Sequence, residues 1–314
     1  MSQREILIVG ATGQQGKATI AALHSTPHNT TAPLRILALT RSASSPKSQS
    51  LQSQFPDIIL VEGDTKTPDP IFLAHPNIAA IFLVTVPSDE EAQATPLIEA
   101  AVAPGRHVDH IVFSSVDRGG DDVSWDQPTD VPHFAAKHRI EHLLRQSCEK
   151  ARTRVRWTIL RPTGFMDNYG PGFFGKLMAT LWQQGMPTDR KMQLVSTRDI
   201  GVFAAKALAD PDGWDGRAVG LAGDELSFAE LKKAFERTTG QTLPTTFGLL
   251  AGPVFWWVEE ARTSFEWFSK VGYGADIASL RSQEPRLQTF EMWLRETSAW
   301  SSAGNGSDSG EVTG

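Results

Sequence analysis

Cysteine and tyrosine are scarce in this sequence of 314 residues, which holds one cysteine, Cys148, and two tyrosines, Tyr169 and Tyr273. A single cysteine excludes an internal disulfide framework and is typical of a reducing compartment. The formal net charge of -6 gives no overall attraction to nucleic acid or to an anionic membrane. No apolar run reaches the length of a membrane span, and the chain enters a strand-like segment too early for a signal peptide. We therefore expect a cytoplasmic protein that binds neither membrane nor, directly, nucleic acid.

Short β-branched runs alternate with helical patterns over the first 160 or so residues. Six of these runs are mostly apolar, as is expected of strands buried on both faces of a parallel sheet: 6–10, 35–40, 57–63, 79–85, 110–115 and 156–161. Helical patterns separate them, at 14–24, 47–54, 90–103 and 134–149. Repeated strand–helix units predict right-handed crossovers and an α/β fold, a Rossmann-like doubly wound parallel sheet.

The pattern changes after residue 161, where glycine and proline interrupt it. We expect residues 1–161, interleaved with later segments such as 192–222, to form the sheet domain. Residues 162–300 are expected to form a smaller, mostly helical substrate-binding or lid region. Its predicted helices are 197–209, 227–239, 259–270 and 287–296, the second opened by a capping box of Ser227 and Glu230. Residues 301–314 are small, polar and glycine-rich, which is typical of a disordered tail.

A glycine-rich turn follows the first predicted strand and opens a helix. Gly10 permits the tight turn, Gly13 lets the backbone approach a pyrophosphate, and Gly16 lets helix and strand pack closely. Backbone N–H groups and the helix dipole then supply an anion site. The predicted dinucleotide cradle consists of Gly10, Thr12, Gly13, Gln14, Gln15 and Gly16.

The end of the second predicted strand favours NADP(H) over NAD. Thr40 stands where an NAD enzyme usually has an acid for the ribose 2′-hydroxyl, and Arg41 follows it. A guanidinium can bind a 2′-phosphate through two hydrogen bonds, and Ser42 or Ser44 can add hydroxyl bonds. Lys47 is a further candidate. A solvated basic turn is the alternative, and it applies most to Lys47.

Two other kinds of site find no support. His133 and His138 have no clustered cysteine or carboxylate partners at metal-ligand spacing, so we expect no metal. The G-x-S-x-G turn of a serine hydrolase is missing as well.

In their order and spacing, nine motifs resemble the NmrA-like family of atypical short-chain dehydrogenase/reductases over roughly residues 4–240. They are GATGQQG, ALTR, EGD, FLVTVP, HIVFSSV, HFAAKHRIEHLL, TILRPTGFMDN, STRDIG and LAGDELS. The resemblance implies a Rossmann-like domain for NADP(H) and a smaller C-terminal part that closes over it. It also implies cofactor contacts: Asp64 and Thr65 near the adenine, Thr85, Val86 and Pro87 beside the ribose, and Pro162, Thr163, Gly164 and Phe165 at the nicotinamide.

The catalytic motif departs from the Tyr-x-x-x-Lys of that superfamily and reads His133-Phe-Ala-Ala-Lys137. Lys137 can bond the nicotinamide ribose and stabilise an alkoxide, or donate a proton itself if it is buried. His133 is of the right type for acid–base work, but Pro132 marks a helix start, where a histidine can be a solvated first-turn residue. Ser114 and Ser115 end the fifth strand, where each either bonds a ligand or satisfies the strand end.

Residues 165–174 mix apolar bulk with polar groups and predict a pocket for a small organic ligand. The candidate substrate contacts are Phe165, Asn168, Tyr169 and, in an acidic loop, Trp125. An aromatic segment at 252–268 is either core or a lid helix; it contains Phe255, Trp256, Trp257, Trp267 and Phe268.

Two functions remain open, each with NADP(H) as cofactor. The first is an oxidoreductase that reduces a carbonyl, imine or iminium, or conjugated group in a mid-sized apolar secondary metabolite, including indole-type alkaloid precursors, with or without coupled cyclisation. Iminium reduction fits the missing tyrosine because its hydride step needs no proton. The second is a non-catalytic redox sensor that regulates a transcription factor or an enzyme. The predicted partner of the enzyme is a small-molecule substrate, and no oligomeric state follows from the sequence.

Overall fold

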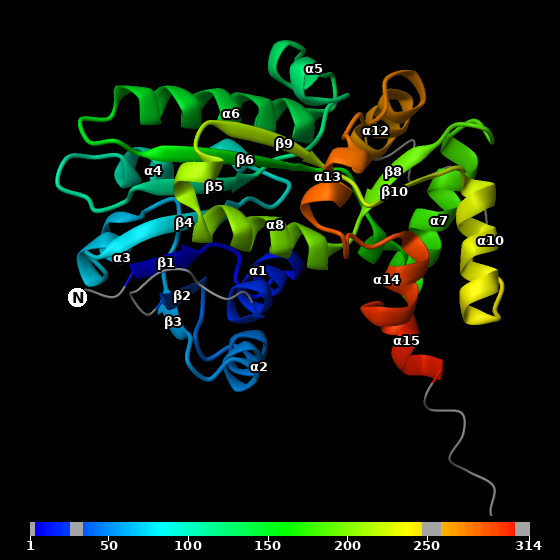
Figure 1. The fold of residues 1–314 in the computed structure, drawn as a ribbon, viewed down its shortest axis with the longest axis horizontal. Coiled ribbons are helices and arrows are strands. Elements are labelled where there is room, and N and C mark those ends of the chain that lie inside the picture. Colours follow the sequence, from blue (N-terminus) through cyan, green and yellow to red (C-terminus); the bar gives the residue numbers. More distant parts are fainter. Residues whose placement is uncertain (1–3, 26–33, 247–258, 305–314) are drawn as a thin grey trace, which may run out of the picture. The chain divides into compact units, whose positions relative to one another are not determined.

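The structure is a computed structural model of the chain, and it describes residues 4–25, 34–246 and 259–304 (Figure 1). The chain divides into two compact units. The first contains Met1–Val116, Ser124–Arg161 and Ile200–Val219, and the second contains Asp117–Val123, Pro162–Asp199 and Gly220–Gly314. Phe255, Trp256 and Trp257 of the aromatic segment lie outside the described residues, as do residues 305–314 of the predicted disordered tail.

The first unit is built on a seven-stranded sheet with the order β3-β2-β1-β4-β5-β6-β9. The strands are β1 (Arg4–Ile8), β2 (Leu34–Thr40), β3 (Ile59–Glu62), β4 (Ile78–Val84), β5 (His110–Ser114), β6 (Arg156–Pro162) and β9 (Arg217–Leu221). From β3 to β6 all neighbouring pairs are parallel. The six predicted strands and the doubly wound fold are confirmed, with strand ends shifted by two residues at most.

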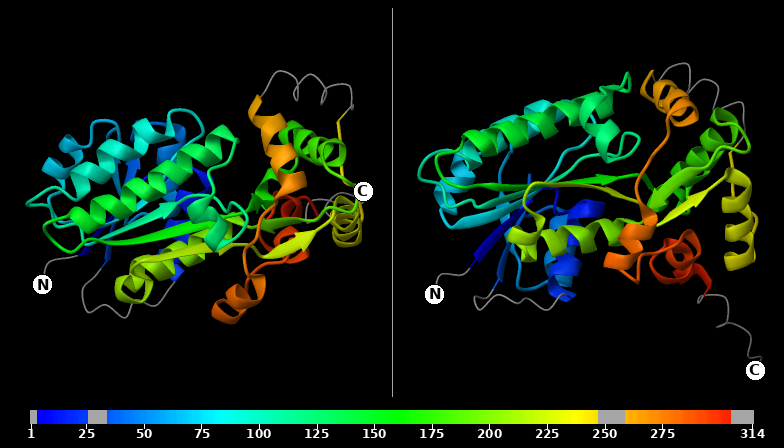
Figure 2. Two further views of the ribbon diagram at one scale, coloured as in Figure 1. Left: turned by 90° about the horizontal axis from the view of Figure 1, so that it is seen from above. Right: turned by 45° about the horizontal axis from the view of Figure 1, so that its top comes forward.

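Helices cover both faces of this sheet (Figures 1 and 2). They are α1 (Gln14–Ser25), α2 (Pro46–Gln54), α3 (Asp69–Ala74), α4 (Glu90–Ala101), α5 (Asp121–Asp126), α6 (Pro132–Lys150), α8 (Thr197–Ala209) and α9 (Pro211–Trp214). α4 and α6 pack together on one face. On the other face α1 and α8 lie so close together that a Cβ atom on Gly201 would be 2.4 Å from the Ala18 carbonyl carbon.

The second unit holds a three-stranded sheet of β7 (Gly164–Phe165), β8 (Met192–Val195) and β10 (Asp224–Leu226). Its helices are η1 (Met166–Tyr169), α7 (Phe173–Gly185), α10 (Phe228–Thr239), α12 (Glu259–Lys270), α13 (Ile277–Gln283), α14 (Phe290–Glu296) and α15 (Ala299–Gly304). Trp182, Phe235 and Trp293 lie in its core. The predicted capping box of Ser227 and Glu230 is present at the start of α10. The mostly helical C-terminal part is therefore confirmed.

His110, at the start of β5, is fully buried, and its Nε2 lies 2.9 Å from the Thr158 hydroxyl oxygen. Burial, assisted by the positive charge of Arg4, lowers the pKa of His110 to about 3. Below pH ~6.5 His110 therefore binds a proton in the unfolded chain but not in the folded protein. Stability falls as pH falls from about 6.5 toward 3.

We expect this one residue to lower the free energy of unfolding by about 1.4 kcal/mol between pH ~7.5 and ~5.5. Urea unfolding at the two pH values measures the loss, and His110→Gln should remove most of it. The exposed His107 offers a matched control, since His107→Gln should leave the pH dependence unchanged. An unaltered slope in His110→Gln would contradict the assignment.

Candidate functional site

The glycine turn lies at the carboxyl end of β1, beside the carboxyl end of β4. Gly10 has φ +67°, and the Gly13 N–H donates to the Gly10 carbonyl at 2.9 Å, which closes the turn. The strand order reverses between β1 and β4, and such reversal points are where open α/β sheets bind ligands. The first turn of α1 leaves its N–H groups without helical acceptors and so offers them to an anion.

The three glycines of the turn differ in how closely an added side chain would meet its surroundings. A Cβ atom on Gly10 would meet Val84 Cγ1 at 2.6 Å, and one on Gly16 would meet the Gly10 carbonyl oxygen at 2.3 Å. Both contacts are too close for any side chain. Gly13 is exposed, and a Cβ atom there would lie 3.2 Å from the same oxygen, which a small shift relieves. Gly10 and Gly16 are therefore required by the fold, whereas Gly13 keeps the outside of the turn open.

The loop after β2 is held by hydroxyl groups. Thr40 and Ser48 are buried, with their hydroxyl oxygens 2.9 Å apart, and Ser48 also donates to the Ser42 carbonyl at 2.7 Å. Thr40, which stands where an NAD enzyme usually has an acid, thus helps to hold this loop in place. The Glu62 carboxylate accepts a hydrogen bond from the Ala43 N–H at 2.6 Å. Arg41 and Lys47 are both exposed on this loop and the start of α2.

The other predicted contacts of the first unit lie in loops after β3 and β4. Asp64 accepts the Lys66 N–H at 2.9 Å, and Thr65 is half-buried beside it. Val86 and Pro87 are exposed, and the Gln93 amide pins the loop through the Val86 N–H and carbonyl at 3.2 and 3.1 Å. This loop ends in strained backbone, since Ser88 and Asp89 have φ values of +96° and +51°. Non-glycine strain of this kind is concentrated at functional sites.

Lys137 is buried and makes three polar contacts at the carboxyl ends of β4 and β5. Its ammonium donates to the Thr85 hydroxyl oxygen at 3.1 Å and to the Ser114 carbonyl at 3.0 Å, and it pairs with the Glu90 carboxylate at 3.1 Å. The structure thus brings together Lys137, Thr85 and Ser114, all three of them residues singled out from the sequence.

Glu90, the residue at the centre of this cluster, was not predicted. Its side chain is 2% exposed, and it accepts hydrogen bonds from the Thr85 hydroxyl and from His133 Nδ1. Burial opposes ionisation, but the His133 hydrogen bond and the charge of Lys137 outweigh it, so the pKa of Glu90 lies below its ordinary value. A signal was available: Glu90 falls on the buried stripe of α4, in register with Ala94 and Leu97, where an acid needs a partner.

Two serines end β5 and serve different partners. The Ser114 hydroxyl donates to the Gln15 amide oxygen at 2.5 Å, which ties β5 to the first turn of α1. The Ser115 hydroxyl donates to Glu141, which also forms an ion pair with Arg161 at 2.8 Å, both side chains being fully buried. Ser115 thus has a structural partner, and Ser114 lies nearer to the predicted cofactor residues.

Trp125 lies at the end of α5 within the first unit. The Arg161 and Arg145 guanidinium groups lie 4.6 and 5.0 Å from its ring centroid, and the Trp157 ring packs against its edge at 5.9 Å. His138 and His142 both contact its backbone carbonyl, at 2.9 and 3.2 Å. These contacts account for the indole as a packing group, while its role toward a substrate stays a prediction.

The remaining predicted residues belong to the second unit. Pro162 and Thr163 are buried, and Thr163 donates twice to the Leu221 carbonyl, at 3.1 Å from its N–H and 3.0 Å from its hydroxyl. Gly164 and Phe165 form β7, and Phe165 and Asn168 are half-buried. Their proposed contacts with nicotinamide and substrate stay predictions.

Tyr169 lies in the core of the second unit. Its ring is 4% exposed and packs 5.7 Å from Trp182 and 6.4 Å from Phe290, measured between centroids. Burial raises the pKa of Tyr169 well above its ordinary value, so the phenol stays protonated. These packing contacts account for the position of the ring, and its contact with substrate stays a prediction.

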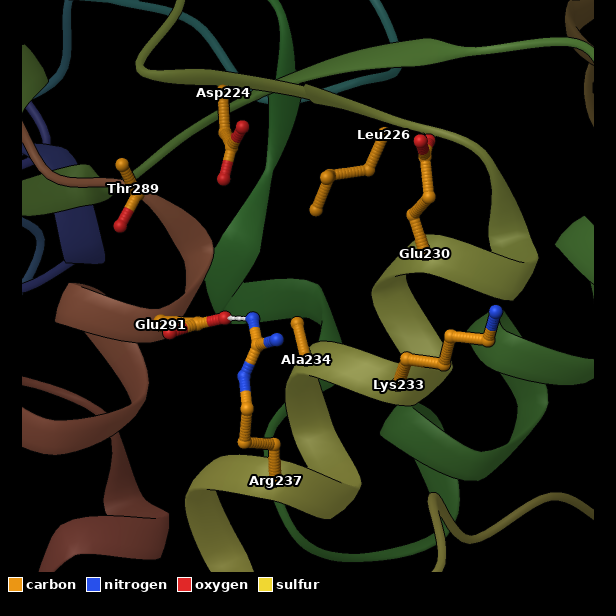
Figure 3. Close-up of a pocket in the computed structure, with 8 residues that line it drawn as sticks. All are labelled: Asp224, Leu226, Glu230, Lys233, Ala234, Arg237, Thr289 and Glu291. Carbon is orange, nitrogen blue, oxygen red and sulfur yellow. Dashed lines mark hydrogen bonds and ion pairs between the residues drawn. The ribbon is translucent and has the colours of Figure 1, made fainter.

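A pocket of about 460 Å³ lies within the second unit, between α10 and α14 (Figure 3). Several of its polar lining residues are engaged in structural bonds. Asp224 accepts the Phe290 N–H at 2.9 Å, Thr289 caps α14, and Arg237 pairs with Glu291. No predicted cofactor or substrate residue lines this pocket, so we assign it no part in the candidate site.

No set of three or more His, Cys, Asp or Glu side chains in the described ranges is arranged to hold a metal ion. Every helix in that part of the chain is too short or too polar to cross a membrane.

A family model described as the NmrA-like family matches residues 2–293. No curated protein sequence matches the chain. Among solved structures, the chain is similar to NmrA, a negative transcriptional regulator, in complex with NADP, at 17% identity and a TM-score of 0.69, covering 98% of this chain and 99% of that one.

Two reductases show the same likeness. Triphenylmethane reductase of Citrobacter sp. complexed with NADP(H) is 17% identical with a TM-score of 0.67, covering 93% of this chain and 99% of that one. An NADPH-dependent quinone oxidoreductase of Escherichia coli complexed with NADPH is 22% identical with a TM-score of 0.68, covering 91% and 97%. At these identities the likeness establishes the fold alone.

Proposed function

The chain belongs to the NmrA-like family, and from this we propose that it is an NADP(H)-dependent oxidoreductase. Its acceptor would be a carbonyl, imine or iminium, or conjugated carbon in a mid-sized apolar molecule. Indole-type secondary metabolites are the first to test, with or without a coupled cyclisation. One observation carries the proposal: buried Lys137 and Glu90 form a cluster with the half-buried His133 at the carboxyl end of the sheet.

The cofactor part of the proposal rests on the turn after β1 and the loop after β2. Open glycine backbone and the start of α1 suit a pyrophosphate, and Arg41 offers a guanidinium to a 2′-phosphate. Similar proteins carry NADP or NADPH in their structures, which supports the same choice here.

The catalytic part rests on the cost of burying charge. Desolvating a carboxylate and an ammonium is expensive, and replacing such a pair by apolar side chains is often neutral or stabilising. A protein that only senses NADP(H) needs the cradle but not an ionic cluster at the ligand-binding edge. The alternative, a non-catalytic regulator, is supported by the missing tyrosine and by the likeness to the regulator NmrA.

In the proposed reaction NADPH, when bound, supplies a hydride. Lys137 holds a fixed positive charge that stabilises negative charge developing on the acceptor oxygen. Glu90 keeps that ammonium protonated and in place, and Ser114 links the cluster to the cofactor turn through Gln15.

Measuring NADPH consumption with naphthoquinone, nitrobenzaldehyde, cyclic imines and malachite green separates the two functions. The oxidoreductase oxidises NADPH only when an acceptor is present. The regulator binds NADPH tightly and oxidises none in any mixture.

Replacing Arg41 by alanine tests the choice of cofactor. We expect the NADPH dissociation constant to rise about 10- to 100-fold while that for NADH changes less than about threefold, because a charge-assisted bidentate bond is lost only with the 2′-phosphate. Isothermal titration measures both constants. Exposed Arg152, in the loop before β6, is the matched control, and Arg152→Ala should alter neither. Equal losses for NADPH and NADH would refute the assignment.

A further inference from the structure

Reduction of a neutral carbonyl needs a proton as well as a hydride, and the tyrosine that would give it is missing from the motif at residues 133–137. We propose that His133 Nε2 donates this proton and that Glu90 is the residue that positions it. The inference rests on the proposed function and names the acid that function requires.

Lys137 is poorly placed to be that acid. An ammonium has three N–H donors, and Lys137 directs them at the Glu90 carboxylate, the Thr85 hydroxyl oxygen and the Ser114 carbonyl. The side chain is 6% exposed. Delivering a proton would break one of these bonds and leave Glu90 buried with less compensation. Lys137 therefore acts as a fixed charge.

His133 has the opposite arrangement. Its Nδ1 contacts Glu90 Oε1, and an ionised carboxylate can only accept, so the proton lies on Nδ1. That leaves Nε2 as the nitrogen that gains and loses a proton. Its side chain is 22% exposed, and among the described residues Nε2 has no hydrogen-bond partner. A carboxylate that fixes the ring at one nitrogen and frees the other is the arrangement of a general acid.

The Glu90 carboxylate contacts both His133 and Lys137. Its Oε1 faces His133, and its Oε2 accepts from Thr85 and pairs with Lys137. The strained turn at Ser88 and Asp89 comes directly before it and starts α4.

The other charged groups near this interface of α4 and α6 lie on the outside. Glu91 and Arg139 pair with each other at 2.6 Å, and Asp89 is 76% exposed, 3.8 Å from Lys66. Glu90 is thus the one carboxylate, among the described residues, that contacts His133.

NADPH, when bound, would give a hydride to the carbonyl carbon and become NADP⁺. The π electron pair would move to oxygen, which takes the Nε2 proton of the imidazolium, and solvent would then return a proton to the ring. A triphenylmethane dye cation takes a hydride at its central carbon and becomes neutral without any proton. Both acceptors therefore need a hydride, but only the carbonyl needs the proton from His133.

The test compares nitrobenzaldehyde with malachite green in wild type, Glu90→Gln and His133→Gln. We expect both variants to lower the ratio of aldehyde to dye reduction about 100-fold. Glu90→Asp should restore part of it. Glu91→Gln removes an exposed carboxylate from the same helix and should leave the ratio unchanged.

A pH profile separates positioning from structural damage. Aldehyde reduction should require the protonated ring, so Glu90→Gln should alter its pH profile and leave the pH profile of dye reduction unchanged. Nitrogen NMR of labelled histidine should show the His133 proton on Nδ1 in the wild type before any substrate is added.

The outcomes are distinct. Hydride transfer to neither acceptor overturns the proposed function. Transfer to dye alone, or an unchanged ratio with an unmoved pH limb in Glu90→Gln, overturns this inference and leaves the oxidoreductase standing.

Discussion

Gly13→Val is expected to weaken NADPH binding at least about 100-fold while the fold survives. Gly13 lies exposed on the outside of the turn, where a pyrophosphate must approach the backbone, and a valine side chain would fill that space. The strain inside the protein is small, since the new Cβ atom lies 3.2 Å from the Gly10 carbonyl oxygen. We expect the free energy of unfolding to change by less than about 1 kcal/mol.

Isothermal titration with NADPH and urea unfolding measure the two halves of this result. Gly16→Val is the informative contrast, because its Cβ atom would lie 2.3 Å from the same oxygen. That variant should lose stability as well as binding. A Gly13→Val protein that binds NADPH as the wild type does would show that the turn is not a cofactor cradle.

Lys137→Met is expected to lower hydride transfer at least about 100-fold and to cost about 3–5 kcal/mol of stability. Methionine fills the space but leaves the Glu90 carboxylate, 2% exposed, with only hydrogen bonds from Thr85 and His133. Activity falls because the fixed positive charge is gone, and stability falls because a buried ion pair has been broken from one side.

The double variant Lys137→Met with Glu90→Gln distinguishes these two effects. Removing the orphaned charge should return most of the lost stability and none of the activity. Lys150→Met, at the exposed end of the same helix, is the control and should change neither quantity. A Lys137→Met protein as active as the wild type would make Lys137 a structural residue only.

The strands of the sheet could be predicted because parallel strands buried on both faces are continuously apolar. ILIVG and HIVFSS show this directly, and the observed strands β1 and β5 end within two residues of the predicted ones. Short helices such as α3 and α13, of 6 and 7 residues, gave no usable period. Long-range packing and caps such as Asp276 hold elements of this length, and neither is visible in a local pattern.

Residues of the candidate site could be predicted where a short motif determines the backbone conformation. They could not be predicted where a side chain depends on a partner far away in the sequence. Gly10, Gly13 and Gly16 followed from one short run. Glu90 did not, because its partners His133 and Lys137 are 43 and 47 residues away and meet it only when α4 packs against α6. The contact of Tyr169 with substrate stays a prediction, since an aromatic residue beside polar residues suits a pocket and a core equally.

Transfer of deuterium from NADPH labelled at the reactive nicotinamide carbon, prepared separately on each face, tests the central claim most directly. Purified protein is incubated with carbonyl, imine, quinone, dye and indole-type acceptors, and the products are weighed by mass spectrometry. We expect one deuterium in a product from one face of the cofactor only, and none in any product of Lys137→Met. Tight NADPH binding with no deuterium in any product would contradict it and would identify the protein as a sensor of NADP(H).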